Sequence, residues 1–296
     1  MVKKIILGLM LSAIVFAGCS RSGQISKETF SKEDGIFLYN VGEFKVYMLV
    51  EGTREGSASI LVDTNEELLS RYIPEEGFFQ STNAFLVKSP NHTVLIDTGT
   101  GVNGIVFDKI KKTGVDPEQI ESVLITHLHG DHFGGLRRDG EPVFPKANIY
   151  LSALELEYFT EIQINQNAVD TLALYDGKVK TFDPADIDAV LSEILPGIKP
   201  IAAYGHTPGH TVFLIEDGDD KLLIVGDILH IGLVQFAVPE ISAVYDVDKE
   251  AAAVSRRIVL DYAARNNIPF GGMHIAYPGI GIVETDEDGF KFIPIE

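Results

Sequence analysis

Short apolar runs alternate along the chain with segments whose apolar residues recur at helical spacing. The apolar runs predict strands at residues 45–50, 83–87, 93–96, 122–125, 148–151, 199–203, 211–215 and 222–225. Helical spacing predicts helices at residues 106–113, 153–159, 184–195 and 249–266. Short polar turns such as 89–91 indicate hairpins as well as helical crossovers. The pattern therefore predicts an α/β protein with mixed sheets covered by helices.

The first residues follow a different pattern. Lys3 and Lys4 precede a mostly apolar run at 5–16, and the small residues Ala17 and Gly18 lead to Cys19. A basic start, a short apolar stretch and small residues are typical of an export signal. The end of this segment also resembles a bacterial lipobox, whose cysteine becomes lipidated. We therefore expect residues 1–19 to be a lipoprotein-type signal peptide. The alternative is an uncleaved apolar start with an incidental cysteine.

This interpretation sets the expected organisation and location of the protein. Cys19 would anchor an exported cell-envelope lipoprotein to a bacterial membrane. Residues 20–34 are polar and lack apolar periodicity, which predicts a tether. Residues 35–296 contain no long low-complexity linker and no repeat, and 45% of the 296-residue chain is hydrophobic. We expect this part to form one domain with a sizeable core.

Charge and cysteine content exclude some classes of partner and site. The chain has 24 Lys and Arg against 43 Asp and Glu, a formal net charge of -19. Such an acidic chain repels phosphate backbones, so nucleic acid is excluded as a partner. Cys19 is the only cysteine. An intramolecular disulfide is therefore impossible, and a metal site in the domain must use other ligands.

One loop carries an unusual density of metal-ligand side chains. The segment 126–132 reads T-H-L-H-G-D-H and follows the apolar run 123–125. Gly130 permits a tight turn that brings the aspartate and histidine after it back toward the first two histidines. Four such groups can serve two ions, with His127 and His129 on one and Asp131 and His132 on the other. A surface loop with incidental histidines is the alternative.

Ligands from distant segments can complete such a site. His210 precedes the predicted strand 211–215, Asp227 follows the strand 222–225, and His274 ends another strand-like run. Imidazole nitrogens and carboxylate oxygens are suitable ligands for zinc. The five histidines and two aspartates therefore predict two divalent ions, zinc above all, with Mn²⁺, Co²⁺ and Fe²⁺ as alternatives.

These motifs resemble those of the metallo-β-lactamase-fold hydrolases. They are Ile96-Asp97-Thr98-Gly99, H-x-H-x-D-H at 127–132, T-P-G-H-T at 207–211, Gly226-Asp227 and Gly272-Met273-His274. The resemblance implies a four-layer αββα sandwich, with two mixed sheets inside and helices outside. It also implies a ligand set for each ion: His127, His129 and His210 for one, Asp131, His132 and His274 for the other, and Asp227 as the bridge.

Within this superfamily the chain looks closest to the methyl parathion hydrolase and N-acyl-homoserine lactonase branch. The segment G-D-I-L-H-I-G-L-V-Q-F at 226–236 and the later H-I-A-Y-P-G-I-G carry that resemblance. The bridging position is Asp227, where zinc β-lactamases use cysteine or serine. β-Lactams are therefore poor candidate substrates.

The resemblance implies a dinuclear metal-dependent hydrolase for a small-molecule ester-like substrate. A hydroxide bridging the two ions would attack a lactone, ester or phosphotriester. Asp131 or Asp227 would then pass a proton to the leaving group. No serine or cysteine nucleophile is required. The sequence does not determine the oligomeric state.

Three other functions remain open at this point. A thioesterase of the glyoxalase II type would act on an anionic substrate, which fits the acidic chain poorly. A mononuclear iron oxygenase on the same fold usually lacks ligands of one ion, whereas all seven ligand positions match here. A non-catalytic binding lipoprotein of the cell envelope would not need the complete ligand set.

Several further residues are candidates for supporting roles. Asp97 follows a buried strand and is expected to accept a hydrogen bond from a ligand histidine. His230 lies three residues after Asp227 and either faces the pocket or packs in the core. Phe236 is a candidate pocket wall within an uncharged stretch. His206 precedes His210 by four residues, and we interpret it as a possible cap of the turn between them.

Overall fold

The computed structural model describes residues 30–296. The predicted signal peptide at 1–19 and most of the predicted tether lie outside the described residues. Within the rest of the tether, residues Lys32–Asp34 form a single 3-10 turn. Phe30 packs edge-on against Tyr47, with ring centroids 6.0 Å apart. Packing against the folded domain therefore begins by residue 30.

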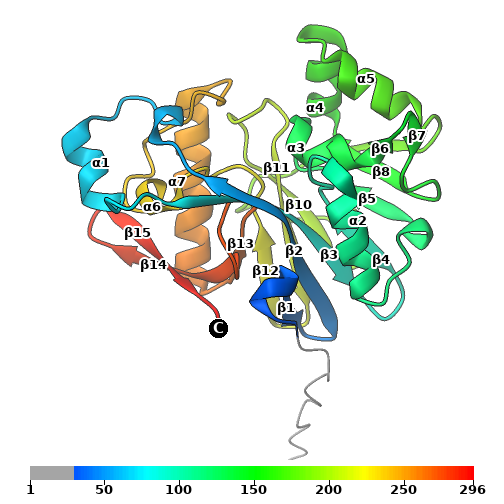
Figure 1. Cartoon of the computed structure of the whole chain (residues 1–296), viewed down its shortest axis with the longest axis horizontal. Coiled ribbons are helices and arrows are strands. Elements are labelled where there is room, and N and C mark those ends of the chain that lie inside the picture. The colour runs from blue at the N-terminus through cyan, green and yellow to red at the C-terminus, as the bar shows by residue number, and fades with distance from the viewer. Residues whose placement is uncertain (1–29) are drawn as a thin grey trace, which may run out of the picture.

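Two large sheets form the centre of the molecule (Figure 1). The first sheet has the order β1 (Ile36–Val41), β2 (Phe44–Glu55), β3 (Phe79–Lys88), β4 (Thr93–Ile96), β5 (Ser122–Leu124), β8 (Asn148–Ser152) and β9 (Val179–Phe182). The second has the order β10 (Ile198–Ala202), β11 (Thr211–Asp217), β12 (Asp220–Ile224), β13 (Phe270–Gly271), β14 (Ile280–Asp286) and β15 (Gly289–Pro294). A separate hairpin pairs β6 (Arg137–Arg138) with β7 (Glu141–Pro142).

Both large sheets are mixed. The run β4-β5-β8-β9 is parallel, whereas β1 to β4 form an antiparallel meander. In the second sheet only the β12–β13 pair is parallel. The predicted strand at 93–96 coincides with β4, and the other predicted strands each overlap an observed one.

Helices cover the outer faces of the sheets. The helices of the described residues are α1 (Glu66–Tyr72), α2 (Ile105–Lys112), α3 (Gly130–Phe133), α4 (Ala153–Glu157), α5 (Gln166–Ala173), α6 (Gly232–Gln235) and α7 (Lys249–Asn266), with a π-helical turn at Tyr158–Ile162. Helices α1 and α6 pack against each other in a separate apolar cluster. Further 3-10 turns lie at Ala58–Ile60, Val102–Gly104, Pro117–Gln119 and Gly134–Leu136. None of these helices combines the length and the apolar character needed to cross a membrane.

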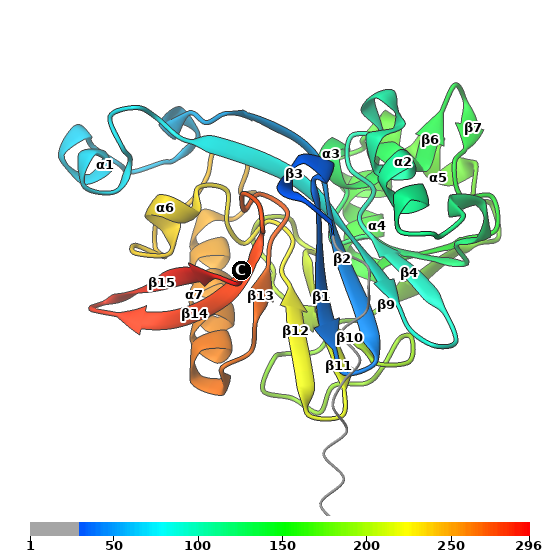
Figure 2. The ribbon, with the colours of Figure 1, turned by 60° about the horizontal axis from the view of Figure 1, so that its bottom comes forward.

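The buried apolar residues confirm four layers. One core cluster lies between the sheets and includes Phe85 of β3 and Phe213 of β11. A second joins the first sheet to α2 through residues such as Ile110. A third joins the second sheet to α7 through residues such as Val259. The predicted αββα sandwich is therefore confirmed, and Figure 2 shows α2 and α7 on opposite sides of it.

The predicted helix at 184–195 is wrong. This segment is irregular and runs beside β10. Its backbone forms isolated bridges to that strand, at Ala185 with Ile201 and at Leu195 with Ile198. Val190, in the middle of the expected helix, is 96% exposed. Pairing with a sheet edge satisfies backbone groups that a helix would have bonded internally. The apolar spacing alone therefore did not predict the conformation of this segment.

Candidate metal centre

The loop that follows β5 carries the H-x-H-x-D-H motif to the edge of the first sheet. His129 is the N-cap residue of the four-residue helix α3, which contains Asp131 and His132. The amide of His132 donates to the carbonyl of His129 at 3.0 Å, which closes this turn. Both His127 and His132 are completely buried. The short helix therefore folds the second half of the motif back beside the first half.

Three imidazole nitrogens and one carboxylate oxygen converge in a first group. His206 Nε2 lies 2.9 Å from His129 Nδ1 and 3.2 Å from His127 Nε2. The His127 and His129 nitrogens are 3.1 Å apart. Asp227 Oδ2 is 3.5 Å from His206 Nε2 and 3.7 Å from His127 Nε2.

A second group lies on the other side of Asp227. His274 Nε2 is 3.1 Å from Asp227 Oδ2 and 3.6 Å from Asp131 Oδ2. His132 Nε2 is 3.3 Å from Asp227 Oδ1 and 3.6 Å from Asp131 Oδ1. Asp227 thus contacts both groups, and each group contains side chains from both sheets.

The spacing of both groups fits metal ions, and the second group also has unsatisfied buried atoms. Ligand atoms bound to zinc at about 2.0–2.1 Å lie ~3.4 Å apart at the corners of a tetrahedron. The separations in the two groups bracket that value. Buried His132 Nε2 and Asp227 Oδ1 have no hydrogen-bond partner. Because buried polar atoms are normally paired, these atoms fit the role of ligands.

Hydrogen bonds at Nδ1 orient four of the histidines. His132 Nδ1 donates to Asp97 Oδ2 at 2.7 Å, and His206 Nδ1 donates to Asp246 Oδ1 at 2.8 Å. His274 Nδ1 donates to the carbonyl of Ser81 at 2.9 Å, and His127 Nδ1 lies 3.1 Å from Thr126 Oγ1. Each bond fixes the tautomer that leaves the Nε2 lone pair free to bind a metal.

His210 occupies a different position from the one predicted. Its Nδ1 donates to the carbonyl of Ala203 at 3.0 Å, and its Nε2 accepts the amide of Asp227 at 2.9 Å. Both ring nitrogens are therefore used within the protein. Gly226 passes close to this ring, because a Cβ there would stand 2.5 Å from His210 Nε2, and its φ is 56°. His206, which we interpreted as a possible turn cap, lies in the first group, in the place expected for His210.

Asp97 supports the loop as well as His132. Its carboxylate accepts the amide of Thr126 at 2.8 Å and the hydroxyl of Thr126 at 2.7 Å. Its own φ is 54°, an uncommon value for a residue other than glycine. Asp97 therefore joins the end of β4 to the start of the motif loop.

Asp246 and Glu155, two buried acidic residues that the sequence did not indicate, hold His206 and the motif loop in place. Asp246 binds His206, and the guanidinium of Arg256 lies 3.6 Å from Asp246 Oδ2. Glu155 accepts hydrogen bonds from the Leu128 amide at 2.7 Å, the Thr207 hydroxyl at 2.6 Å and the Gly209 amide at 3.0 Å. Neither residue stands in a local pattern that predicts these contacts.

Burial sets the protonation of the first group. It lowers the pKa of His129 and of His206 to about 4, and that of His127 well below its usual value. These imidazoles are therefore neutral at pH 7, the form that binds metals. Burial likewise raises the pKa of Glu155 to about 7, against the effect of its three donors.

In the second group, nearby carboxylates outweigh burial and raise the pKa of the histidines. Burial alone would lower the pKa of His132, but Asp227, Asp97 and Asp131 outweigh it and raise this pKa well above its usual value. The pKa of His274 is raised in the same way, by Asp227 and Asp131 against burial. Burial would raise the pKa of Asp227, but His132, His274 and His127 hold it well below its usual value.

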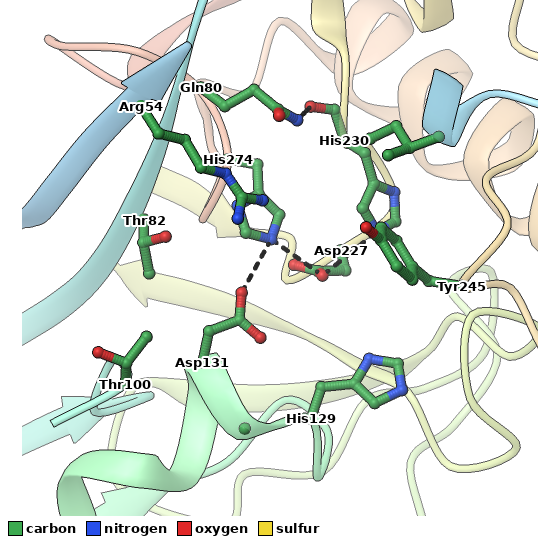
Figure 3. A pocket seen from close by; sticks show the side chains of 12 residues that line it. Arg54, Gln80, Thr82, Thr100, His129, Asp131, Asp227, His230, Tyr245 and His274 are labelled. Carbon is green, nitrogen blue, oxygen red and sulfur yellow. Dashed lines mark hydrogen bonds and ion pairs between the residues drawn. The ribbon is translucent and has the colours of Figure 1, made fainter. Parts of the chain in front are cut away.

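A pocket of about 360 Å³ opens beside Asp131, Asp227 and His274 (Figure 3). His230 lines it, and neither ring nitrogen of this buried side chain has a hydrogen-bond partner. Its ring stacks on His274, with centroids 5.6 Å apart and an interplanar angle of 22°. Phe236 lies elsewhere, in the core beneath α7, where it stacks on Phe292 at 5.2 Å.

Residues 77–267 match the family model of the metallo-beta-lactamase superfamily. Among solved structures, the hydrolase AbOPH of the beta lactamase superfamily is 28% identical, with a TM-score of 0.77. AidC, a dizinc quorum-quenching lactonase in complex with a product, is 25% identical, with a TM-score of 0.78. Each similarity covers 88% of this chain and 98% of the other.

Curated relatives share a smaller part of their length with the chain. An atrochrysone carboxyl ACP thioesterase from Aspergillus chevalieri is 30% identical over 213 residues, which is 70% of this chain and 53% of the relative. The lactamase-like protein aptB from Emericella nidulans is 30% identical over 152 residues, 50% of this chain and 40% of the relative. The chain thus spans about half or less of the length of these relatives.

Proposed function

The chain belongs to the metallo-β-lactamase superfamily, and we propose that it is a dinuclear metal-dependent hydrolase of small lactones, esters or phosphotriesters. The observation that carries this proposal is the pair of ligand groups that share Asp227. A single ion would need only one of these groups. The shared carboxylate supports two ions held side by side.

The geometry supports one change in the ligand set expected from the sequence. We assign one ion to His127, His129 and His206, and the other to Asp131, His132 and His274, with Asp227 shared. His206 replaces His210 because the two ring nitrogens of His210 already have partners. Zinc suits this set of imidazoles and carboxylates, and manganese, cobalt or iron remain alternatives.

Two divalent ions in such a site supply a nucleophile at neutral pH, because they lower the pKa of water, and they stabilise developing negative charge. Protein side chains would supply the proton transfer and a hydrogen bond to the substrate. Asp131 faces the pocket with 32% of its side chain exposed, whereas Asp227 is 4% exposed. Asp131 is therefore better placed to pass a proton to the leaving group. His230 can donate a hydrogen bond to a substrate oxygen through Nδ1, which has no hydrogen-bond partner, whereas its Nε2 lies 3.4 Å from Asp227 Oδ2.

The comparisons support ester-like substrates. AidC is a lactonase, and the A. chevalieri relative is a thioesterase. Thioesters therefore remain a second candidate class, despite the acidity of the chain. The shared ligand is Asp227 and the chain offers no cysteine there, so β-lactams are the least favoured class.

Metal content and turnover test this proposal together. The purified protein should contain close to two divalent ions per chain, lose activity with a chelator and regain it with zinc, manganese or cobalt. Asp227→Ala should lose most metal and nearly all activity, because both groups depend on this carboxylate. His92→Ala is the matched control, since the His92 side chain bonds to Ser89 in a turn and belongs to neither ligand group.

The substrate panel should contain lactones, aryl esters, phosphotriesters, thioesters and β-lactams. We expect lactones or esters to give the highest kcat/KM. If Asp227→Ala keeps both ions and the full rate, the dinuclear assignment fails. A β-lactam that leads the panel by an order of magnitude would overturn the substrate class.

A further inference from the structure

The wall of the pocket away from the metal centre carries several polar side chains. It is formed by Arg54, Ile60, Gln80, Thr82, Thr100 and Tyr245. Ile60 is the only aliphatic side chain among the pocket-lining residues that the structure describes. Phe236, the expected apolar wall, is absent from this lining. A long hydrocarbon chain would find few aliphatic side chains here, whereas Arg54, Gln80, Thr82 and Thr100 offer polar groups to a substrate.

The pairing of β2 with β3 explains how Arg54 enters this wall. Arg54 pairs with Gln80, and Gly52 pairs with Thr82. Cross-strand partners and alternate residues share one face of a sheet, so Arg54, Gln80 and Thr82 face the same way. Gly52 has no side chain on that face. Gln80 Nε2 donates to the carbonyl of His230 at 2.9 Å, which joins this face to the segment that follows Asp227.

The charge of Arg54 is not used within the protein. Between residues 30 and 296 its guanidinium has no hydrogen bond and no ion pair, and it is the only Lys or Arg that lines the pocket. Four other arginines have acidic partners: Arg71 with Glu67, Arg256 with Asp246, Arg257 with Glu240 and Arg265 with Asp261. The remaining two of the described part contact neutral side chains, Arg137 with Asn167 and Arg138 with Phe107. Figure 3 shows the Arg54 side chain extending from its strand toward His274.

We propose that Arg54 binds an oxyanion, a carboxylate or a phosphate, carried by the substrate at a distance from its scissile bond. This inference rests on the proposed hydrolase function and specifies its substrate class. A guanidinium binds two oxygens of such a group through parallel N–H donors. The scissile ester or lactone would lie beside Asp131 and Asp227, and the oxyanion would lie against β2.

The acidity of the chain does not prevent this recognition. The formal net charge of -19 repels anions at long range. Charges farther than about 8 Å are largely screened at physiological ionic strength, however. Once the substrate is in the pocket, the nearby guanidinium therefore outweighs the distant surface carboxylates. The global charge should lower the rate of anion association without removing the preference of the bound state.

Direct binding tests the oxyanion site without requiring turnover. The ligands are three amides of similar length: butyramide, succinamate and 3-phosphonopropanamide. Calorimetry on the metal-loaded protein should show that Arg54→Gln weakens one or both anionic ligands about tenfold or more, since a charge-assisted bidentate contact is lost. Butyramide binding should not change. The comparison of succinamate with the phosphonate identifies which oxyanion the site prefers.

Matched variants separate the effect of the Arg54 charge from the effect of its planar geometry, and both from the general effect of replacing an arginine. Arg54→Lys keeps the charge but loses the planar pair of donors, so it should fall between wild type and Arg54→Gln. Arg71→Gln is the control, because Arg71 is exposed on α1 and does not line the pocket. Equal binding of the anions to wild type and Arg54→Gln would overturn the proposal, since the anions would then bind elsewhere.

Hydrolysis of paired esters links this site to the proposed function. 4-Nitrophenyl hemisuccinate and 4-nitrophenyl butyrate differ mainly by the carboxylate. Wild type should favour the hemisuccinate in kcat/KM, and Arg54→Gln should remove that preference mainly through KM. Turnover of both esters with the same ratio of kcat/KM in wild type and in Arg54→Gln would sink the oxyanion site alone. Binding that depends on Arg54, with no ester cleaved, would sink the hydrolase function alone.

Discussion

At the scale of single residues, the two histidines of the segment Y-G-H-T-P-G-H-T have different roles. They are four residues apart and of the same chemical type. His206 presents Nε2 to the first ligand group, while Asp246 takes its Nδ1 proton. His210 bonds to Ala203 and to the amide of Asp227. One histidine is thus suited to bind an ion, and the other supports the backbone beside the shared carboxylate.

Alanine at each position should separate these roles. His206→Ala should reduce the metal content by about one ion per chain after dialysis. His210→Ala should retain both ions but lower the free energy of unfolding by about 1–3 kcal/mol, because a buried amide and a buried carbonyl lose their partner. Metal analysis and urea unfolding measure the two effects. If His210→Ala loses an ion and His206→Ala keeps both, His210 is the ligand.

The pH dependence of metal binding should differ between the two groups. The pKa values of His129 and His206 are about 4, so the first group binds an ion without releasing a proton above pH 6. The pKa of His132 is raised well above its usual value, so in the metal-free protein an ion must displace this proton. Affinity in the second group should therefore rise with pH, up to about tenfold per unit for each displaced proton.

Calorimetry in buffers of different ionisation enthalpy counts the protons released by each ion. At pH 6 the ion in the second group should also be the first to dissociate. Equal proton release at both positions, or the first group losing its ion first, would contradict this prediction.

At the scale of elements, a few buried polar residues tie separate segments to the centre. Glu155, in the first turn of α4, bonds to the loop between His127 and His129 and to the segment after His206. Gly209 must be small here, because a Cβ would stand 2.3 Å from the amide nitrogen of Glu155. Helix α4 therefore holds together two ligand segments that are far apart in the sequence.

Replacing Glu155 should loosen both ligand segments. In Glu155→Gln only one of the two carboxylate oxygens remains, so a buried donor faces an amide NH₂ group. We expect a loss of about 1–3 kcal/mol in unfolding free energy and a lower kcat/KM. Glu157→Gln is the control, since Glu157 is exposed at the end of the same helix. Urea unfolding and kinetics of both variants check this, and equal behaviour of the two would refute the role of Glu155.

The same scale shows which elements sequence patterns can predict. The helix at 249–266 was predicted with its observed bounds, because an N-cap aspartate and a left-handed Asn267 mark its ends. The segment 184–195 has comparable apolar spacing, but pairing with β10 decides its conformation. Strands β14 and β15 were not predicted, although their residues pair as a hairpin. Local signals thus define an element only where no distant strand competes for its backbone.

At the scale of the whole molecule, the two sheets together complete the centre. His127, His129, Asp131 and His132 follow the first sheet, whereas Asp227 and His274 follow strands of the second. Neither sheet alone supplies a complete ligand group. Metal binding should therefore be linked to the packing of the two sheets against each other.

The location of the molecule remains a proposal based on its first residues, which lie outside the described part of the structure. We propose that wild type partitions with membranes and that Cys19→Ala releases or misprocesses it, because lipidation requires this cysteine. Stable anchoring requires more than one acyl chain, since one gives only marginal binding. Ser22→Ala is the control. Wild type found wholly in the soluble cytoplasmic fraction would refute the anchor.

The sequence by itself indicated most of the candidate metal ligands, because histidines and aspartates stand at strand ends or in one compact loop. It also indicated where most of the strands lie along the chain, because short apolar runs of that length tend to be buried. Only the tertiary structure distinguishes the surroundings of His206 from those of His210, because the amide of Asp227 and the carboxylate of Asp246 reach them from distant segments. The register of β2 with β3 likewise brought Arg54 to the pocket in place of Phe236. Contacts of this kind depend on which strands lie side by side, and no local spacing encodes them.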